Sequence, residues 1–160
     1  MSEHSNITLP MKFENVAHEA LISVWWTGIM LKKEAKRFFK SDLNSDAQFN
    51  ILMILKYAEE PMSQNDLSLR LLVDKSNITG LVDRMEKLQL IRRNPVPGDR
   101  RRYSITLTPK GSELIDELEV AYEQRVQQIM SEFSEEECRL LVKLTTELRR
   151  GIASLEETFR

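Results

Sequence analysis

The spacing of apolar residues changes from helical to strand-like between residues 75 and 107, and this change constrains the fold more than any other feature of the sequence. Apolar side chains recur every three or four residues over 75–88, a spacing that is typical of an amphipathic helix. Two short runs of partly alternating polarity follow at 90–93 and 103–107, separated by residues rich in turn formers. These patterns predict a helix followed by a β-hairpin.

A shorter helix is expected just before this segment. Ser63 is followed three residues later by Asp66, a pattern that caps the N-terminus of a helix. Leu67, Leu69 and Leu71 lie in the turns that follow. Two short helices joined by a tight turn and followed by a hairpin are typical of a winged helix-turn-helix, in which the second helix enters the major groove of DNA.

Two helices are expected upstream. No proline interrupts the helical spacing over 12–40, which predicts one long helix. Ser45 and Gln48 form a capping-box pattern that opens the next helix. That helix should end at Glu60, because the residue before a proline avoids the helical conformation.

Two further helices are expected after the hairpin. Thr108 and Pro109 supply an N-cap and a proline at the first helical position, and Ser134 with Glu137 forms another capping box. Apolar residues over 141–159 follow a heptad-like spacing, and such a strip often packs against a partner chain. An intrachain core is the alternative interpretation of this strip.

We therefore expect a mostly α-helical protein, a winged helix-turn-helix with a helical dimerisation region built from the N- and C-terminal helices. Residues 1–44 and 109–160 would form the dimerisation region, and residues 45–108 the DNA-binding domain. A homodimer would present two reading heads about one helical turn of DNA apart, matching an inverted repeat.

The near-neutral charge of the chain conceals a basic segment. The 160 residues carry 23 Lys and Arg against 25 Asp and Glu, for a net charge of −2. Residues 84–110, however, hold eight basic and two acidic side chains. A local excess of this kind suits the phosphate backbone of double-stranded DNA. A solvated charged surface is the alternative.

Composition argues against several other classes of protein. The single cysteine excludes an intrachain disulfide framework and a Cys-rich metal site, and His18 has no second histidine nearby with which to bind a metal. The longest mostly apolar run, 20–31, is shorter than the roughly 20 residues of a membrane span. The polar start also lacks the basic region of a signal peptide. We expect a soluble, cytoplasmic protein without a metal and without membrane association.

Catalysis is not expected. The carboxylates of Glu59 and Glu60, like those of Glu156 and Glu157, are adjacent in sequence, so the members of each pair do not face each other on a helix. The chain also lacks a glycine-rich loop that could hold a phosphate group. We therefore expect neither an enzyme nor a cofactor.

The MarR (multiple antibiotic resistance regulator) transcription factors have a recognition helix that resembles residues 74–86, DKSNITGLVDRME. Their wing and the start of their next helix resemble residues 99–101 together with 105–111, ITLTPKG. The resemblance implies a homodimer that binds a pseudo-palindromic operator, usually as a repressor. Release by a small aromatic or phenolic ligand, or by an oxidant, would follow. A winged helix that binds protein instead of DNA is the alternative, but it has no need of three consecutive arginines.

The resemblance also implies which residues bind DNA. The first turns of the recognition helix would contact base edges in the major groove, with Arg84 on the backbone or a base. Arg101 would enter the minor groove, while Asp99 would hold the wing arginines by charge-assisted hydrogen bonds. Backbone N–H groups of Ser63 and Gln64 would bind phosphate. The expected set is Ser63, Gln64, Ser76, Asn77, Thr79, Arg84, Asp99, Arg100, Arg101 and Arg102.

Three positions depart from the family's pattern. Gly80 stands where arginine is common, which removes a base contact and costs about 1 kcal/mol of helix stability. Gln89 replaces the usual glycine after the recognition helix, which predicts a strained or differently shaped turn. Val96 stands where an acid is frequent, which leaves Asp99 as the expected sole organising carboxylate of the wing.

Two candidate sensing sites lie outside the DNA-binding region. Trp25 and Trp26, in the first helix, would suit a planar ligand, with a dimer core as the alternative. Cys138 follows three glutamates, which disfavour the reactive thiolate. The peroxide-sensing members of the family also carry their cysteine near the N-terminus, so oxidation sensing is not expected.

Overall fold

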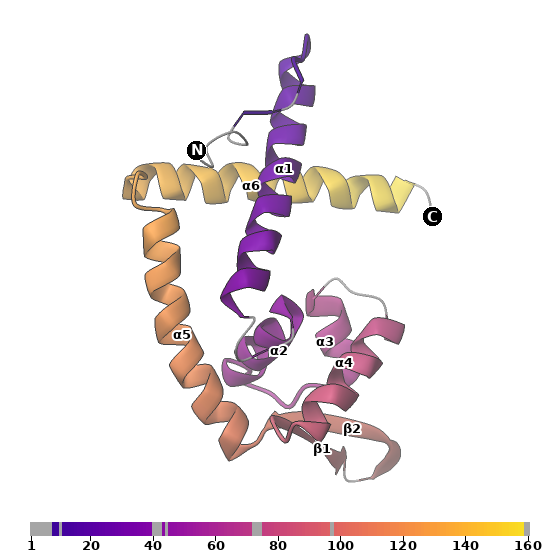
Figure 1. Ribbon diagram of the computed structural model, residues 1–160. Helices are drawn as coiled ribbons and strands as arrows, with labels where there is room; N and C mark the ends of the chain where they lie inside the picture. Colours follow the sequence, from indigo (N-terminus) through magenta and orange to yellow (C-terminus); the bar gives the residue numbers. More distant parts are fainter. Residues whose placement is uncertain are drawn as a thin grey trace. The chain divides into compact units, whose positions relative to one another are not determined.

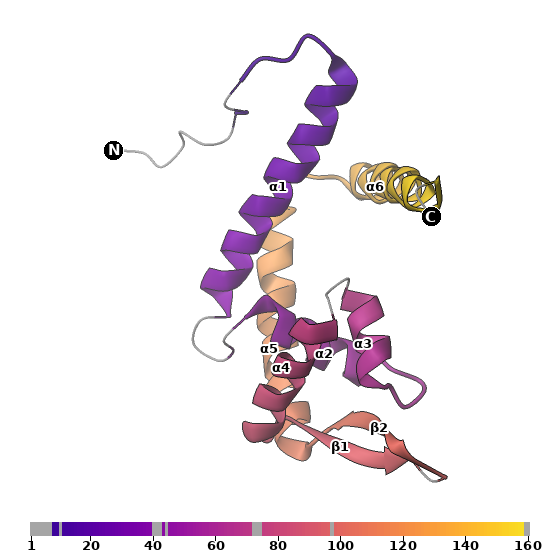
Figure 2. The same ribbon diagram turned by 90° about the vertical axis from the view of Figure 1, so that its right-hand side faces the viewer.

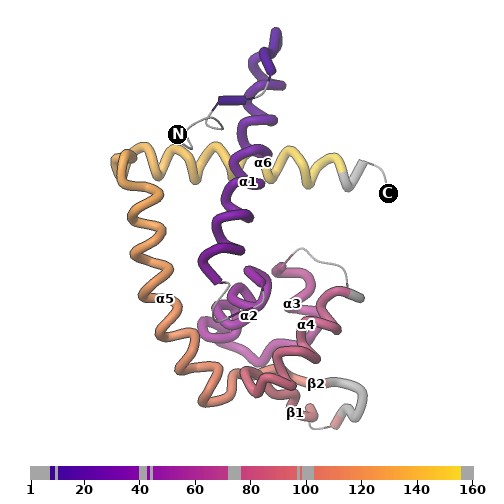
Figure 3. Tube along the Cα trace, viewed as in Figure 1, coloured from indigo at the N-terminus to yellow at the C-terminus, as the bar shows by residue number. Residues whose placement is uncertain are grey.

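A computed structural model of the chain describes residues 8–9, 11–39, 43, 45–71, 75–96 and 98–158 (Figure 3). The chain forms two compact units, residues 1–115 and 116–160, so that helix α5 begins in the first and ends in the second. In order, the elements are α1 (Val16–Phe38), α2 (Asp46–Lys56), α3 (Gln64–Leu71), α4 (Lys75–Lys87), β1 (Ile91–Val96), β2 (Asp99–Leu107), α5 (Pro109–Ile129) and α6 (Glu135–Thr158). The predicted mostly helical winged helix-turn-helix is confirmed.

The core of the first unit lies where α2, α3 and α4 meet the hairpin (Figure 1). The side chains that fill it come from all of these elements and from the first turns of α5, and each is almost completely shielded from solvent. They include Ile51, Leu52, Leu67, Ile78, Val82, Met85, Ile91, Ile105 and Ile115. Burial of apolar residues at helical spacing on α4 sets which of its faces remains exposed.

The hairpin is longer than predicted. Residues 94–96, expected in the turn, belong to β1, which pairs antiparallel with β2 from Ile91 opposite Leu107 to Pro95 opposite Tyr103. Proline is tolerated in a strand that needs no hydrogen bond on that edge. Gly98, with φ of 85°, lies in the turn, and Figure 2 shows both strands extending away from α4.

The hairpin is tied to the start of α3. The N–H of Ile105 in β2 donates to the carbonyl oxygen of Met62 at 2.7 Å, which forms an isolated antiparallel bridge. Both side chains are buried. The bridge therefore joins the hairpin of β1 and β2, which is the wing of this fold, to the residue just before the Ser63 cap.

Two helix boundaries differ from the prediction. Helix α1 begins at Val16 instead of residue 12, because the Asn15 side chain accepts hydrogen bonds from the N–H groups of Ala17 and His18 at 2.8 and 3.1 Å. Such an N-cap defines the first turn more strongly than apolar spacing does. Helix α2 ends at Lys56, before Glu60, as the Tyr57 N–H bonds back to Met53.

The predicted capping box at Ser45 is wrong, although α2 does begin there. Among the described residues, no hydrogen bond joins the Ser45 side chain to the helix. Gln48, the other member of the pattern, is 1% exposed and packs in the core.

The end of α4 packs against the start of α5. Gln89 lies in the left-handed region at φ 59°, and the N–H groups of Gln89 and Leu90 donate to the carbonyls of Glu86 and Met85. This is a Schellman motif, in which glycine is usual at the left-handed position. Of the two outcomes expected here, a strained or a differently shaped turn, the structure shows strain at the left-handed Gln89 in a turn of the usual form. The Lys110 ammonium donates to the carbonyl oxygen of Leu88 at 2.9 Å. A side chain of α5 thus supplies a hydrogen bond to a carbonyl group just after the end of α4.

The two terminal helices expose much apolar surface. The structure describes every residue of α1, and none is buried. On α6, Leu141, Leu144, Ile152 and Leu155 are each about half exposed. The predicted capping box of α6 is confirmed, because the N–H and hydroxyl of Ser134 both donate to Glu137 at 2.8 Å. Among the described residues, no helix is long and apolar enough to span a membrane.

Candidate DNA-binding interface

The start of α3 is a closed capping box. The N–H and hydroxyl of Ser63 donate to Asp66 Oδ2 at 2.8 and 2.7 Å, and the Asp66 N–H donates back to Ser63 Oγ at 3.2 Å. The Ser63 N–H, expected to bind phosphate, therefore already has a carboxylate partner in this structure. This leaves the N–H groups further into the first turn as the better phosphate donors.

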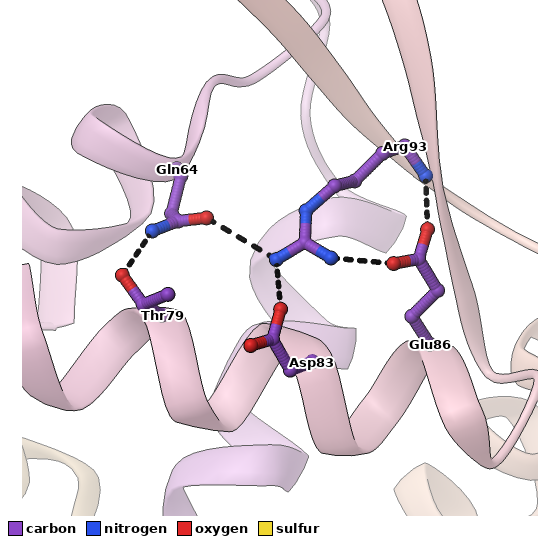
Figure 4. A network of polar contacts seen from close by, with 5 residues as sticks. All are labelled: Gln64, Thr79, Asp83, Glu86 and Arg93. Carbon is purple, nitrogen blue, oxygen red and sulfur yellow. Dashed lines mark hydrogen bonds and ion pairs between the residues drawn. The ribbon is translucent and has the colours of Figure 1, made fainter.

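Arg93 is the centre of a polar cluster that joins three elements (Figure 4). From β1, its guanidinium bonds to Asp83 Oδ1 of α4 at 2.5 Å and to Glu86 Oε2 of α4. The Arg93 backbone N–H also donates to Glu86 Oε1, at 3.0 Å. On the α3 side, Arg93 Nη2 lies 3.4 Å from Gln64 Oε1. The wing strand is thereby attached to both helices of the helix-turn-helix.

The charge of Arg93 is stabilised by this environment. Burial disfavours the charged form, but hydrogen bonds and charge from Asp83 and Glu86 outweigh it and raise the pKa of Arg93. The side chain of Arg93 is 22% exposed, whereas those of its two partners are more open to solvent. Arg93 therefore acts as a permanent donor in a partly shielded site.

These contacts correct one prediction and reveal a missed residue. Asp99 was expected to be the wing's sole organising carboxylate, but Asp83 and Glu86 hold the wing from α4. Arg93 was absent from the predicted set. The available signal was a pair of acids three residues apart on one helix face, followed after a turn by a basic strand. That signal does not specify which arginine completes the cluster.

The exposed face of α4 carries three of the predicted base-contacting side chains. Asn77, Thr79 and Arg84 are exposed, opposite the buried face. Thr79 Oγ1 accepts a hydrogen bond from Gln64 Nε2 at 2.5 Å. A Cβ added at Gly80 would lie 3.4 Å from Arg84 Nη1, so the Arg84 guanidinium reaches back one turn over the glycine. The Ser76 side chain lies outside the described residues.

The three consecutive arginines of β2 lie in an irregular part of the hairpin. Tyr103 pairs with Pro95, and the next pair towards the turn is Asp99 with Val96. Arg100, Arg101 and Arg102 therefore occupy the stretch of β2 between these pairs. Their side chains, and that of Asp99, lie outside the described residues.

The predicted sensing residues lie on α1. Trp25 is 67% exposed and Trp26 is half-buried. The ring of His18 packs edge-on against Phe13, with centroids 4.8 Å apart. In the described part of the chain, no group of three or more His, Cys, Asp or Glu side chains could hold a metal ion.

A helix-turn-helix formed by α3 and α4, followed by the basic hairpin of β1 and β2, defines a winged-helix DNA-binding protein. Residues 42–102 match the MarR family model. The chain is 31% identical to the HTH-type transcriptional regulator PecS of Dickeya dadantii over 68% of this chain and 67% of that one. It is 32% identical to the homoprotocatechuate degradative operon repressor of Escherichia coli, over 64% of this chain and 69% of that one.

Solved structures agree with these matches. The transcriptional regulator BldR of Sulfolobus solfataricus superimposes with a TM-score of 0.74 at 28% identity, over 88% of this chain and 99% of that one. The chain belongs to the MarR family of DNA-binding transcriptional regulators.

Proposed function

We propose that this regulator is a repressor that binds a pseudo-palindromic operator as a homodimer and is released by a small molecule. The observation that carries the DNA-binding part is the exposed face of α4, with Asn77, Thr79 and Arg84 on it, next to a wing that Arg93 holds in place. In a helix-turn-helix this is the face that enters the major groove. The three consecutive wing arginines supply charge for the neighbouring minor groove.

Within that interface we assign roles by position. Ser76, Asn77 and Thr79 would contact base edges, and Arg84 would contact the backbone or a base. Arg101 would enter the minor groove. Arg100 and Arg102 would contact the DNA phosphate backbone beside that groove. Asp99 would orient these arginines. Ser63 and Gln64 would lie near a phosphate at the start of α3.

The homodimer is supported by the terminal helices. The described residues of α1 and α6 expose apolar side chains that include Leu21, Val24, Leu31, Leu141, Leu144 and Ile152. An exposed apolar surface of this extent usually marks an interface. A second copy of the chain, related by a two-fold axis, would cover both helices and match the symmetry of an inverted repeat.

The effector is inferred from chemistry on α1. Trp25 and Trp26 offer aromatic surface on α1, a helix that would lie at the dimer interface. One relative is named for a homoprotocatechuate degradative operon. We therefore propose a small aromatic or phenolic effector bound near the two tryptophans.

The test is selection of random-sequence duplexes by the purified protein at near-physiological salt, followed by sequencing of the bound pool. We expect an enriched inverted repeat with half-sites about one helical turn apart. Asn77→Ala should change the preferred sequence, and Arg101→Ala should weaken binding or relax the A·T preference. Weak, salt-sensitive binding without enrichment would contradict the proposal and favour a winged helix that binds protein.

A further inference from the structure

The polar cluster beside α4 fixes the orientation of one side-chain amide. A guanidinium can donate hydrogen bonds but cannot accept them. The Gln64 atom that faces Arg93 Nη2, at 3.4 Å, must therefore be the oxygen. The amide nitrogen then faces Thr79 Oγ1 at 2.5 Å, where it can only donate (Figure 4). Chemistry thus requires the Thr79 oxygen to accept from Gln64.

This hydrogen bond determines what Thr79 presents to a ligand. The Cβ of threonine carries one hydroxyl and one methyl group, and its χ1 angle is restricted by that branching. Holding the hydroxyl towards Gln64 of α3 fixes the position of the methyl group as well. Thr79 is exposed and lies in the second turn of α4, where helix-turn-helix proteins contact base edges.

We propose that Thr79 recognises a thymine through contact between its methyl group and the C5-methyl of the base, with Gln64 as the residue that positions it. This inference rests on the proposed entry of α4 into the major groove. Among the four bases only thymine presents a methyl group there, and the threonine methyl is a suitable apolar partner for it. Arg93 contributes by fixing the Gln64 amide, and Asp83 with Glu86 fix Arg93.

The first experiment replaces each thymine of the selected half-site, one at a time, by deoxyuridine, which lacks only the C5-methyl. We expect one position in each half-site at which the affinity falls about three- to fourfold, the scale of one buried methylene group. Replacing that thymine in both half-sites should lower the affinity about tenfold. The ratio of affinities for thymine and uracil duplexes is the readout in every variant below.

Matched variants separate the methyl from the hydroxyl. Thr79→Val replaces the hydroxyl by a second methyl group, so a methyl is presented whichever of the two branches faces the base. This variant should retain the ratio of affinities for thymine and uracil duplexes. Thr79→Ser removes the methyl and should reduce the ratio to about one. Gln64→Met removes the hydrogen bond and should lower the ratio by releasing the Thr79 rotamer. Adding Thr79→Val to Gln64→Met should restore it, because valine presents a methyl without needing to be positioned. A general loss of helix stability would not produce this rescue.

Two results would overturn the inference while leaving operator binding intact. One is a selected half-site in which no thymine depends on its methyl group. The other is a ratio that survives in Thr79→Ser and is lost in Thr79→Val, which would mean that the hydroxyl reads the base. Failure to select any half-site would instead overturn the proposed function, and this inference with it.

Discussion

Arg93 of β1 and Asp83 of α4 form an ion pair with 2.5 Å between Nη2 and Oδ1, so the wing and the recognition helix are joined by a direct contact. The same guanidinium contacts Glu86, one turn further along α4. Planar, forked donors allow arginine to bond two carboxylates at once, which a lysine ammonium does less well. The geometry couples the element proposed for the major groove to the element proposed for the minor groove.

Arg93→Met should lower the free energy of unfolding by about 1–2 kcal/mol, because two neighbouring carboxylates lose their shared cation. The free energy of unfolding of Arg93→Lys should lie between those of Arg93→Met and the wild type. Urea denaturation measures both. A suitable control is Arg139→Met on α6, whose ion pair with Glu135 is 76% and 78% exposed and should contribute about 0.5 kcal/mol or less. Equal stability of Arg93→Met and the control would contradict the coupling.

Gly111→Ala should destabilise the protein by about 3 kcal/mol, at the upper end for overpacking. A Cβ at this position would lie 1.9 Å from the carbonyl oxygen of Leu90, a backbone atom that cannot move away cheaply. Gly80→Ala is the control with the opposite sign, because its Cβ would meet only the flexible end of Arg84, at 3.4 Å. It should stabilise α4 by about 0.5–1 kcal/mol. A neutral Gly111→Ala in urea denaturation would refute the close approach.

Features that depend on a few neighbouring residues could be predicted from the sequence. The Ser63–Asp66 and Ser134–Glu137 caps form as expected, because each requires only side chains three residues apart at an exposed helix start. The unusual turn at Gln89 was expected on a different ground, the resemblance, because the family usually has a glycine at this position. The Ser45 pattern is as strong, but among the described residues the Ser45 side chain makes no capping hydrogen bond.

Features that depend on contacts between elements could not be predicted. The Arg93 cluster needs β1 to lie beside α3 and α4, and apolar spacing alone gives no distance between them. Pro95 was expected in a turn because proline is typical of turns. It lies in β1 because, among the described residues, the outer edge of β1 pairs with no other strand. A residue without a backbone N–H is therefore tolerated there. The proposed methyl-reading role of Thr79 is argued from the cluster and therefore shares its dependence on tertiary structure.

Gln89→Gly should stabilise the protein by about 0.5–1 kcal/mol. The left-handed conformation at φ 59° costs a non-glycine residue about 1–2 kcal/mol, and the greater chain entropy of glycine in the unfolded state offsets part of the gain. Gln89→Val should destabilise, since a β-branched residue is still less suited to that region. The urea midpoint should be highest for Gln89→Gly, intermediate for the wild type and lowest for Gln89→Val. A Gln89→Gly variant no more stable than the wild type would contradict the left-handed geometry.

Glu137 should make the start of α6 sensitive to acid. Hydrogen bonds from the backbone N–H and hydroxyl of Ser134 lower the pKa of Glu137 below its ordinary value of 4.5. A carboxylate whose pKa is lower in the folded state contributes stability that is complete above that ordinary value. The contribution is lost as the pH falls through the folded-state pKa.

Glu137→Gln mimics the protonated side chain, so it should lower Tm at pH 7 and have progressively less effect below about pH 4. Thermal unfolding followed by circular dichroism at pH 7, 5 and 3 measures the difference between variant and wild type. Glu136→Gln, which removes a first-turn charge outside the capping box, is the matched control for the interaction with the helix dipole. The Tm values of the two variants should differ at pH 7, and this difference should become smaller as the pH is lowered. A Tm difference between Glu137→Gln and wild type that stayed constant across this range would mean that the Ser134 hydrogen bonds do not stabilise the charged form.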